Sequence, residues 1–203
     1  MKQLWYAACR GLAGLILNLW GWKIKGDFPQ HLNQFIVIVA PHRKGFPDVL
    51  LGWCVKELKP IPAQRFLVKY EAYHNFWYGW IMKYLGGIPI DRKRQYDPSV
   101  PKGQYVQNIK AMVATGERMT IVITPEGTRT PNAPWKRGFY QLALGTQLPV
   151  VPALFNYDEK IVEIGSPMIM SGNVAYDVSM IYKWYDLRSV SRYIPVIHPE
   201  DFK

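Results

Sequence analysis

The sequence is poor in cysteine, and it lacks the short motifs that build several common kinds of active site. Its 203 residues include only Cys9 and Cys54, too few for a disulfide-stabilised scaffold or a zinc site made of cysteines. No H-E-x-x-H pair, Walker A loop or G-x-S-x-G elbow is present, which excludes the enzyme classes that these motifs define. Cys54 falls on an apolar helical face and is expected in the core rather than as a nucleophile. We therefore expect neither a bound metal nor a cofactor.

Acidic residues are also scarce, and the resulting positive charge is concentrated in the first half of the chain. Lys and Arg number 25 against 15 Asp and Glu, a net charge of +10, and the first hundred residues hold 14 basic and 6 acidic residues. Such an excess indicates an anionic partner: nucleic acid, phospholipid headgroups or a phosphorylated substrate. The 8 Trp and 13 Tyr residues favour a membrane interface, but such rings also stack on bases. Composition leaves these alternatives open.

The N-terminal segment predicts an amphipathic helix, because Arg10 and Asn18 are its only strongly polar residues between Leu4 and Trp22. One face of that helix is apolar and contains Leu4, Trp5, Leu12, Leu15, Ile16, Leu19 and Trp22. The other contains Gln3, Arg10, Asn18 and the small residues Ala7, Gly11, Gly14 and Gly21, which would let that side rest on the body of the protein. We predict a helix that lies in a membrane interface, the alternative being a helix buried in its own domain.

The rest of the chain alternates between short apolar runs and longer helical patterns. Strands are predicted at 35–40, 65–69, 88–90, 119–124, 149–155 and 160–164, and helices at 48–58, 75–85, 100–115, 138–144 and 174–186. Gly145 would end the fourth of these helices. Strands separated by helices predict an α/β fold with a mostly parallel central sheet flanked by helices. We divide the chain into a membrane-associating helix, 1–24, and one catalytic domain, 25–203.

Polar side chains follow the predicted strands at their carboxyl ends, where open α/β sheets place their binding sites. His42 comes two residues after the strand 35–40, and Asp48 begins the next helix. A histidine beside a carboxylate provides a general base, because the carboxylate fixes the imidazole tautomer and stabilises the imidazolium. Taken alone, such a pair is structural as often as it is catalytic.

A second polar segment, Glu126, Gly127, Thr128 and Arg129, follows the strand 119–124. An arginine forks two phosphate oxygens and a carboxylate accepts from a hydroxyl, so the segment suits a phosphate next to an alcohol. A polar turn would explain it equally well.

Two further cations stand at strand ends. Lys69 closes the strand 65–69, and Arg92 follows the strand 88–90. A surface ion pair is the plain alternative for Arg92, and such a pair contributes less than about 1 kcal/mol.

Together these segments resemble the motifs of the glycerolipid acyltransferases typified by lysophosphatidic acid acyltransferase. Four motifs occur in the family's order: residues 41–48 with His42 and Asp48, residues 87–92, residues 125–129, and the Pro-Val-Val-Pro stretch 149–152. The resemblance covers roughly residues 25–165. In the first motif five residues separate His42 from Asp48, where the family usually has four, so the loop must bulge if Asp48 is to face His42.

The resemblance implies a role for each candidate residue. His42 would deprotonate the acceptor hydroxyl, with Asp48 orienting it. The acceptor would be bound at its phosphate by Lys69, Arg92 and Arg129, and at its glycerol part by Glu126 and Gly127 with Thr128 beside them.

The implied activity is transfer of a fatty acyl group to the free hydroxyl of a lysophospholipid, with lysophosphatidic acid as the first candidate, in phospholipid biosynthesis. The donor would be a thioester, acyl-CoA or acyl carrier protein. The protein would work at a phospholipid surface, on the cytoplasmic face of the inner or plasma membrane, without nucleic acid. Alternatives are acylation of glycerol 3-phosphate or an amino-acid lysolipid, and a non-catalytic protein that binds lipid or nucleic acid.

Overall fold

The computed structural model describes residues 2–42, 45–77, 79–90, 104–130, 133–188 and 197–202. In chain order its elements are α1 (Lys2–Trp20), β1 (Lys23–Lys25), β2 (Gln34–Ala40), α2 (Phe46–Leu58), β3 (Ala63–Lys69), α3 (Tyr70–Tyr73), α4 (Gly79–Tyr84), β4 (Gly87–Ile90), α5 (Gln104–Ala114), β5 (Met119–Ile123), α6 (Gly138–Thr146), β6 (Val150–Asn156), β7 (Ile161–Ile164), α7 (Val174–Asp186) and the short 3-10 helix η2 (Pro199–Phe202). Arg92 lies outside the described residues.

The strands form one seven-stranded sheet in the order β1-β7-β6-β2-β5-β3-β4. The five strands from β6 to β4 run parallel, while β7 pairs antiparallel with β6. The predicted mostly parallel α/β sheet is therefore confirmed. The short strand β1, which pairs in parallel with β7, was not predicted, because its sequence is only Lys-Ile-Lys.

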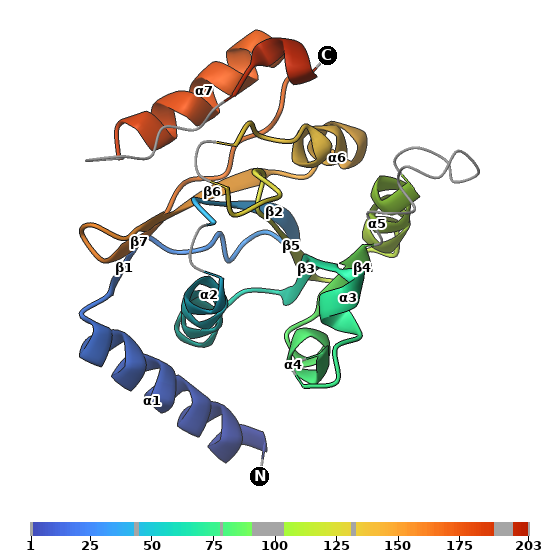
Figure 1. Cartoon of the computed structure of the whole chain (residues 1–203). Coiled ribbons are helices and arrows are strands. Elements are labelled where there is room, and N and C mark those ends of the chain that lie inside the picture. Colours follow the sequence, from blue (N-terminus) through green and yellow to red (C-terminus); the bar gives the residue numbers. More distant parts are fainter. Residues whose placement is uncertain are drawn as a thin grey trace.

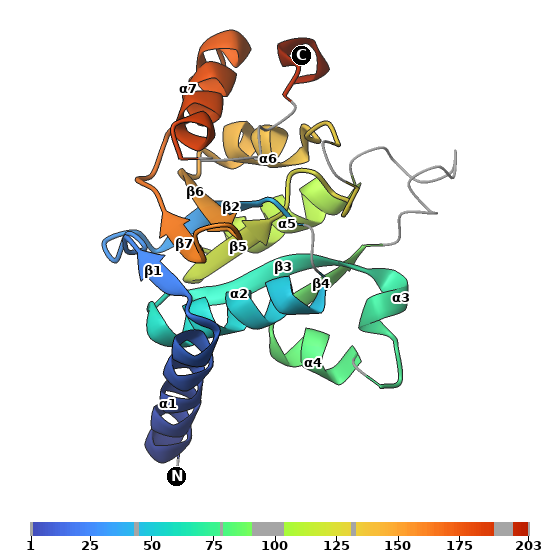
Figure 2. The same ribbon diagram turned by 60° about the vertical axis from the view of Figure 1, so that its left-hand side comes forward.

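Helices cover both faces of this sheet, as Figures 1 and 2 show. In strand β2, successive side chains enter opposite layers: Ile36 and Ile38 pack towards α5, α6 and α7, and Phe35 and Val37 pack towards α1 and α2. All four are buried. An apolar run buried on both faces is the usual composition of a central parallel strand.

The N-terminal helix α1 packs on α2 through a narrow stripe rather than through its polar face. Ala13 and Leu17 are buried there against the core cluster that includes Leu51 and Val55 of α2. The small-residue face predicted to rest on the body does so in part. A Cβ built on Gly14 would lie 3.9 Å from Leu58 of α2 and one on Gly21 3.8 Å from Lys160, whereas one on Gly11 would meet nothing within 4 Å. Ala13 and Leu17 are the residues of the helix that become buried, and apolar side chains gain more by burial than glycines do. Among the described helices, none is long and apolar enough to cross a membrane.

Helices α4 and α6 differ from their predicted bounds. The helix predicted at 75–85 begins only at Gly79 and ends at Tyr84, because a turn follows α3. In that turn the side-chain oxygen of Asn75 accepts from the N–H of Trp77, and the backbone carbonyl of Asn75 accepts from the N–H of Gly79. An asparagine side chain competes with the helix for backbone N–H groups. Helix α6 does not end at Gly145 but continues to Thr146, and Gln147 then adopts a left-handed φ of 55°.

The parallel strands bring their carboxyl ends to one edge of the sheet. The paired registers put the residues that follow β2, β5, β3 and β6 beside one another, so segments far apart in sequence meet there. Helix α2 starts at this edge and runs back along the sheet (Figure 2). The candidate residues that the structure describes close or follow these strands, or lie in the first turn of α2.

Candidate active site

The histidine and the aspartate of the first motif are in direct contact. Nδ1 of His42 lies 2.8 Å from Oδ2 of Asp48. The His42 side chain is 22% exposed and that of Asp48 4%, so the imidazole meets solvent while its carboxylate partner is buried. With Nδ1 donating to Asp48, Nε2 of the neutral imidazole is the nitrogen that accepts a proton. The pair therefore has the geometry of a general base with its orienting carboxylate.

The five-residue spacing is accommodated as the sequence required, with Asp48 facing His42. Gly45 precedes α2 with a left-handed φ of 68°, a conformation that glycine adopts without strain, and its N–H donates to Oδ2 of Asp48 at 3.2 Å. Asp48 is the third residue of α2, where a carboxylate caps the helix and interacts favourably with its dipole. The position of Asp48 is thus set by the helix start as well as by His42.

Asp48 has another partner that was not predicted. The hydroxyl of Tyr157, the residue directly after β6, donates to Oδ1 of Asp48. The two residues are 109 positions apart in sequence. Like His42, Tyr157 comes two residues after a predicted strand, 149–155, so its position at a strand end is the sequence signal that points to it.

Glu126 holds the backbone of the loop that carries His42. Its Oε2 accepts from the N–H of His42 at 2.8 Å, and its side chain is buried. Below it, the Tyr185 hydroxyl donates to the carbonyls of Ile38 and Ala153. Burial, with the nearby charge of Glu126, raises the pKa of Tyr185 well above its usual value and keeps that hydroxyl protonated. Glu126 therefore ties the third motif to the first, and a role in binding the acceptor stays a prediction.

Arg129 lies beside the loop between His42 and Asp48. A Cβ built on Gly45 would come within 3.3 Å of Nη1 of Arg129, so the guanidinium covers Gly45. The turn that leads to Arg129 is closed by a hydrogen bond from Gly127 to Thr124 at 3.0 Å, and Gly127 has a φ of 60°. The structure thus brings Arg129 to the edge of the His42–Asp48 pair.

The remaining predicted residues are placed less closely. Lys69 is exposed at the carboxyl end of β3, and the register between β3 and β5 sets it level with the start of the third motif. The hydroxyl of Thr128 lies 3.1 Å from that of Thr130. No described contact joins either Lys69 or Thr128 to His42, and phosphate or glycerol binding by them stays a prediction.

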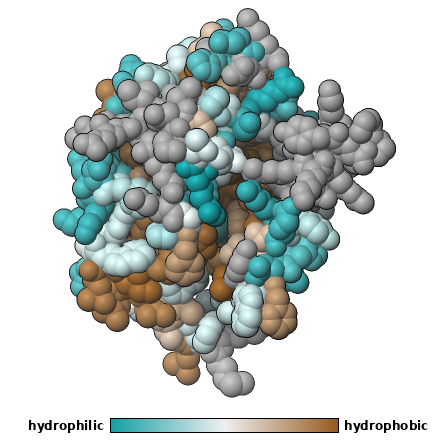
Figure 3. All heavy atoms as spheres, viewed as in Figure 1, coloured by the Kyte–Doolittle hydropathy of each residue, from teal (hydrophilic) through white to brown (hydrophobic). Residues whose placement is uncertain are grey.

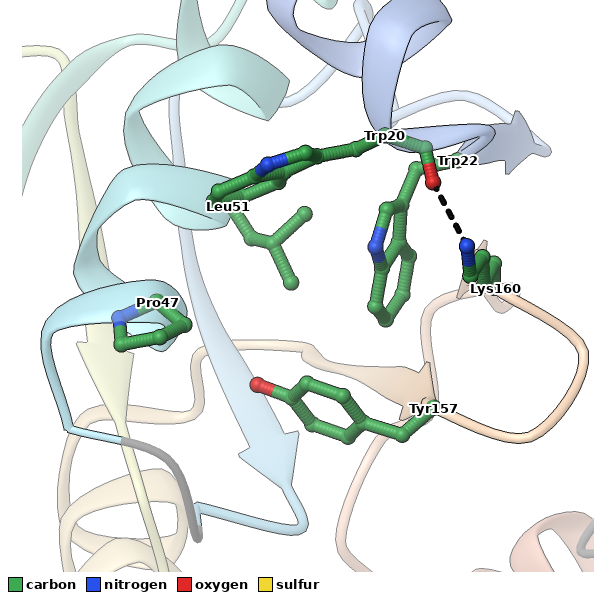
Figure 4. A pocket seen from close by; sticks show the side chains of 6 residues that line it. All are labelled: Trp20, Trp22, Pro47, Leu51, Tyr157 and Lys160. Carbon is green, nitrogen blue, oxygen red and sulfur yellow. Dashed lines mark hydrogen bonds between the residues drawn. The ribbon is translucent and has the colours of Figure 1, made fainter.

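A cavity of about 240 Å³ lies beside Tyr157, between the end of α1 and the start of α2. Figure 4 shows its walls, which are formed by Trp20, Trp22, Pro47, Leu51, Tyr157 and Lys160. The cavity is mostly aromatic and aliphatic, and it borders the site because Tyr157 also contacts Asp48.

Other chemistry finds no support among the described residues. Cys54 is completely buried in α2, and burial raises the pKa of its thiol to about 11, which leaves almost no thiolate near neutral pH. Across the described part of the chain, no three His, Cys, Asp or Glu side chains gather as metal ligands would.

The family model described as Acyltransferase matches residues 23–156 of the chain, which is more than half of it. The matched segment contains the His42–Asp48 pair and the third motif, and it ends just before Tyr157. No solved structure matches the chain.

Curated relatives are similar at modest identity. A 1-acyl-sn-glycerol-3-phosphate acyltransferase of Streptococcus pneumoniae is 28% identical over 64% of this chain and 46% of its own length. The proteins named 1-acyl-sn-glycerol-3-phosphate acyltransferase alpha in Homo sapiens and 1-acyl-sn-glycerol-3-phosphate acyltransferase in Limnanthes douglasii are 29% and 27% identical, each over 70% of this chain and 48% of the relative. The chain thus aligns with about half the length of the curated relatives it matches.

Proposed function

The chain belongs to the Acyltransferase family, and on that premise we propose that it transfers a fatty acyl group from an acyl thioester to the free hydroxyl of lysophosphatidic acid. The observation that carries this proposal is the contact between Nδ1 of His42 and Oδ2 of Asp48 at 2.8 Å, made by a buried carboxylate and a histidine that solvent reaches. The names of the relatives, all 1-acyl-sn-glycerol-3-phosphate acyltransferases, support this acceptor.

The proposed reaction needs one base and no covalent enzyme intermediate. Nε2 of His42 takes the proton of the acceptor hydroxyl while the hydroxyl oxygen attacks the thioester carbonyl. Asp48 stabilises the imidazolium that forms. The tetrahedral intermediate then breaks its carbon–sulfur bond, and the departing thiolate takes the proton from His42. The products are an ester and a free thiol, with the histidine returned to its neutral state and no cofactor consumed.

An acyltransfer assay tests the chemistry. Purified protein is supplied with vesicles containing lysophosphatidic acid and, separately, with a labelled acyl-CoA or the same acyl group on acyl carrier protein. We expect phosphatidic acid and free thiol in equal amounts, and His42→Ala should lower turnover by about 10²–10⁴-fold. His198→Ala, at an exposed histidine near the C-terminus, is the matched control. The proposal fails if His42→Ala turns over at the wild-type rate.

We further assign the acceptor phosphate to Arg129, which lies against the loop between His42 and Asp48, with Lys69 at the neighbouring strand end and Arg92 as an additional candidate. Arg129→Ala should lower kcat/KM for lysophosphatidic acid. The loss should correspond to about 1.5–3 kcal/mol of transition-state stabilisation, the value of a hydrogen bond to a charged group. The comparison acceptor is the monoacylglycerol that lacks the phosphate, and Lys183→Ala on α7 is a control for the lost charge. Equal losses on both acceptors would remove phosphate binding from Arg129.

The proposed acceptor is a membrane lipid, and the outer face of α1 supports contact with a membrane. Leu4, Leu12, Leu15 and Leu19 are all at least half exposed, and their spacing sets them on one side of the helix. Figure 3 shows hydrophobic surface at the lower left, where Figure 1 draws α1. We propose that this helix lies in one leaflet at the cytoplasmic face, because its polar residues Arg10 and Asn18 are also exposed and would face lipid if it spanned the bilayer.

The turn between α3 and α4 supports the same membrane contact. Phe76 and Trp77 are 86% and 79% exposed, their rings meet edge to face at 5.3 Å, and the indole N–H of Trp80 is bonded to the carbonyl of Trp77. Aromatic rings with satisfied polar groups suit the boundary between headgroups and acyl chains. Figures 1 and 2 both show α1 and α4 at the lower end of the molecule.

Vesicle co-sedimentation tests the membrane proposal. Leu15→Gln with Leu19→Gln, and separately Phe76→Ser with Trp77→Ser, should each reduce binding to anionic vesicles, whereas Leu187→Gln at the exposed end of α7 should not. Neutral vesicles should bind the wild type less well than anionic ones, because the first hundred residues are strongly basic. Reporter cysteines introduced as Lys2→Cys and Asp27→Cys, with Cys9→Ser, should label from the same side of sealed vesicles. Labelling from opposite sides would establish a spanning helix.

A further inference from the structure

We infer that Tyr157 is a positioning residue of the proposed acyltransfer reaction: its hydroxyl holds Asp48 in the orientation that aligns His42. This inference rests on the proposed function and adds to it a residue beyond the segment that the family model matches. Tyr157 follows β6, the strand that pairs with β2 in the sheet, whereas His42 follows β2 and Asp48 belongs to α2.

The two oxygens of Asp48 have different partners. Oδ2 accepts from Nδ1 of His42 at 2.8 Å and from the N–H of Gly45 at 3.2 Å, while Oδ1 accepts from the hydroxyl of Tyr157. A carboxylate held only through Oδ2 could rotate about its Cβ–Cγ bond and lose its alignment with the imidazole. The hydrogen bond from Tyr157 opposes that rotation, because it fixes the second oxygen from an independent part of the chain.

The turn that carries Tyr157 is itself held in place. Oδ1 of Asn156 accepts from the N–H groups of Asp158 and Glu159, at 3.1 and 3.0 Å. Lys160 anchors the far end of the turn to the end of α1, because its Nζ lies 3.0 Å from the carbonyl of Trp20. The backbone carbonyl of Lys160 also accepts from the N–H of Lys23 at 2.9 Å. Tyr157 therefore sits on a turn tied at both ends.

The ring of Tyr157 has a fixed direction as well. The indole of Trp22 meets it edge to face, with the ring centroids 5.1 Å apart and the planes at 88°. Figure 4 shows the Tyr157 side chain extending across the cavity, with its hydroxyl pointing toward the side of Pro47 at the start of α2. Edge-to-face contacts of this kind favour one ring orientation. The hydroxyl is thus directed to the first turn of α2, where Asp48 is the third residue.

This arrangement gives a physical reason why the longer loop between His42 and Asp48 is compatible with an aligned dyad. A longer loop between His42 and Asp48 restricts the position of the aspartate relative to the histidine less than a shorter loop would. Gly45 and Tyr157 supply constraints from the helix start and from β6 instead.

The test compares Tyr157→Phe, which keeps the ring and its contact with Trp22, with Tyr176→Phe, which removes a hydroxyl from an exposed tyrosine on α7. Tyr157→Phe should lower kcat about tenfold and leave KM for the acceptor within about twofold, because the acceptor does not contact this hydroxyl in the proposed reaction. In an Asp48→Asn background, Tyr157→Phe should cause no further loss, since a residue that acts through Asp48 has nothing left to align.

A second measurement does not depend on activity. In protein labelled with ¹⁵N-histidine, the Nδ1–H resonance of His42, identified by its loss in His42→Gln, should shift in Tyr157→Phe and not in Tyr176→Phe. An unchanged resonance, or an equal loss of kcat in the wild-type and Asp48→Asn backgrounds, would overturn the inference. If the wild type transferred no acyl group at all, the proposed function would fall, while the resonance would still decide whether Tyr157 aligns the pair.

Discussion

Two buried aspartates, Asp48 and Asp177, are held in similar ways on opposite faces of the sheet. Asp48 accepts from the backbone of Gly45 and from a tyrosine hydroxyl. Asp177 accepts from the backbone of Ser171 and Gly172, from the Ser171 hydroxyl and from the hydroxyl of Tyr140, at 2.8 to 3.1 Å. Both aspartates are at most 5% exposed. Burial, a place in the first turn of a helix and a tyrosine partner are therefore not what marks a catalytic carboxylate.

The difference between the two lies in a histidine partner and in access to solvent. Asp48 meets a histidine that is 22% exposed, at the edge of the sheet where the strand ends gather. The hydrogen bonds of Asp177 described above come from a tyrosine, a serine and a glycine, and they join the start of α7 to the loop before it and to α6. The first carboxylate can stabilise a proton that arrives from outside, whereas the second stabilises the fold. In the proposed reaction, the same local construction therefore serves chemistry at Asp48 and packing at Asp177.

The largest effect that would separate the two sites is on turnover. Asp48→Asn should lower kcat by about 10²–10⁴-fold, because the amide no longer stabilises the imidazolium of His42. Asp177→Asn should leave the kcat of the folded protein within about twofold of wild type. Steady-state assays at matched concentrations of folded protein measure both. If both variants lost turnover equally, the assignment of separate roles would be wrong.

A smaller effect, on stability, should have the opposite order. Asp177→Asn should lower the free energy of unfolding by about 1–3 kcal/mol, because an amide nitrogen would face donors that now bond a carboxylate. Asp48→Asn should cost less, since the amide oxygen can keep the hydrogen bonds from His42 and Gly45 while the amide NH2 donates to the hydroxyl oxygen of Tyr157. Denaturant unfolding followed by circular dichroism measures the difference. The comparison breaks if Asp48→Asn proves the more destabilising change.

The smallest effect is in the acid range. Burial alone would raise the pKa of Asp177, but the hydrogen bonds from Ser171, Tyr140 and Gly172 outweigh it and lower the pKa below its ordinary value. A lowered pKa in the folded state contributes stability above the unfolded value of about 3.9, and this stability is lost as the pH falls through the folded value. The difference in melting temperature between wild type and Asp177→Asn should therefore shrink below about pH 4. A difference that stayed constant from pH 7 to pH 3 would contradict this account.

Much of the site could be predicted because its parts are local in the chain. His42 and Asp48 are separated by a strand end and a helix start, and both boundaries follow from an apolar run and from Gly45-Phe46-Pro47. The segment with Glu126 and Arg129 follows a second buried strand in the same way. Parallel strands then bring these ends together, so the pattern alone indicated one site. The late start of α4 at Gly79 was missed because the side chain of Asn75 bonds the N–H of Trp77 where the pattern indicated a helix.

What the sequence by itself determined is the order of strands and helices, the polar residues at the strand ends and the chemistry that those residues allow. The tertiary structure alone decided that Tyr157 reaches Asp48, that Glu126 holds the backbone of His42, and that α1 docks through Ala13 and Leu17 and leaves its leucine face uncovered. The physical reason is distance along the chain. A partner 84 or 109 residues away is specified by strand register and helix packing, and neither leaves a periodic signal in the residues that make the contact.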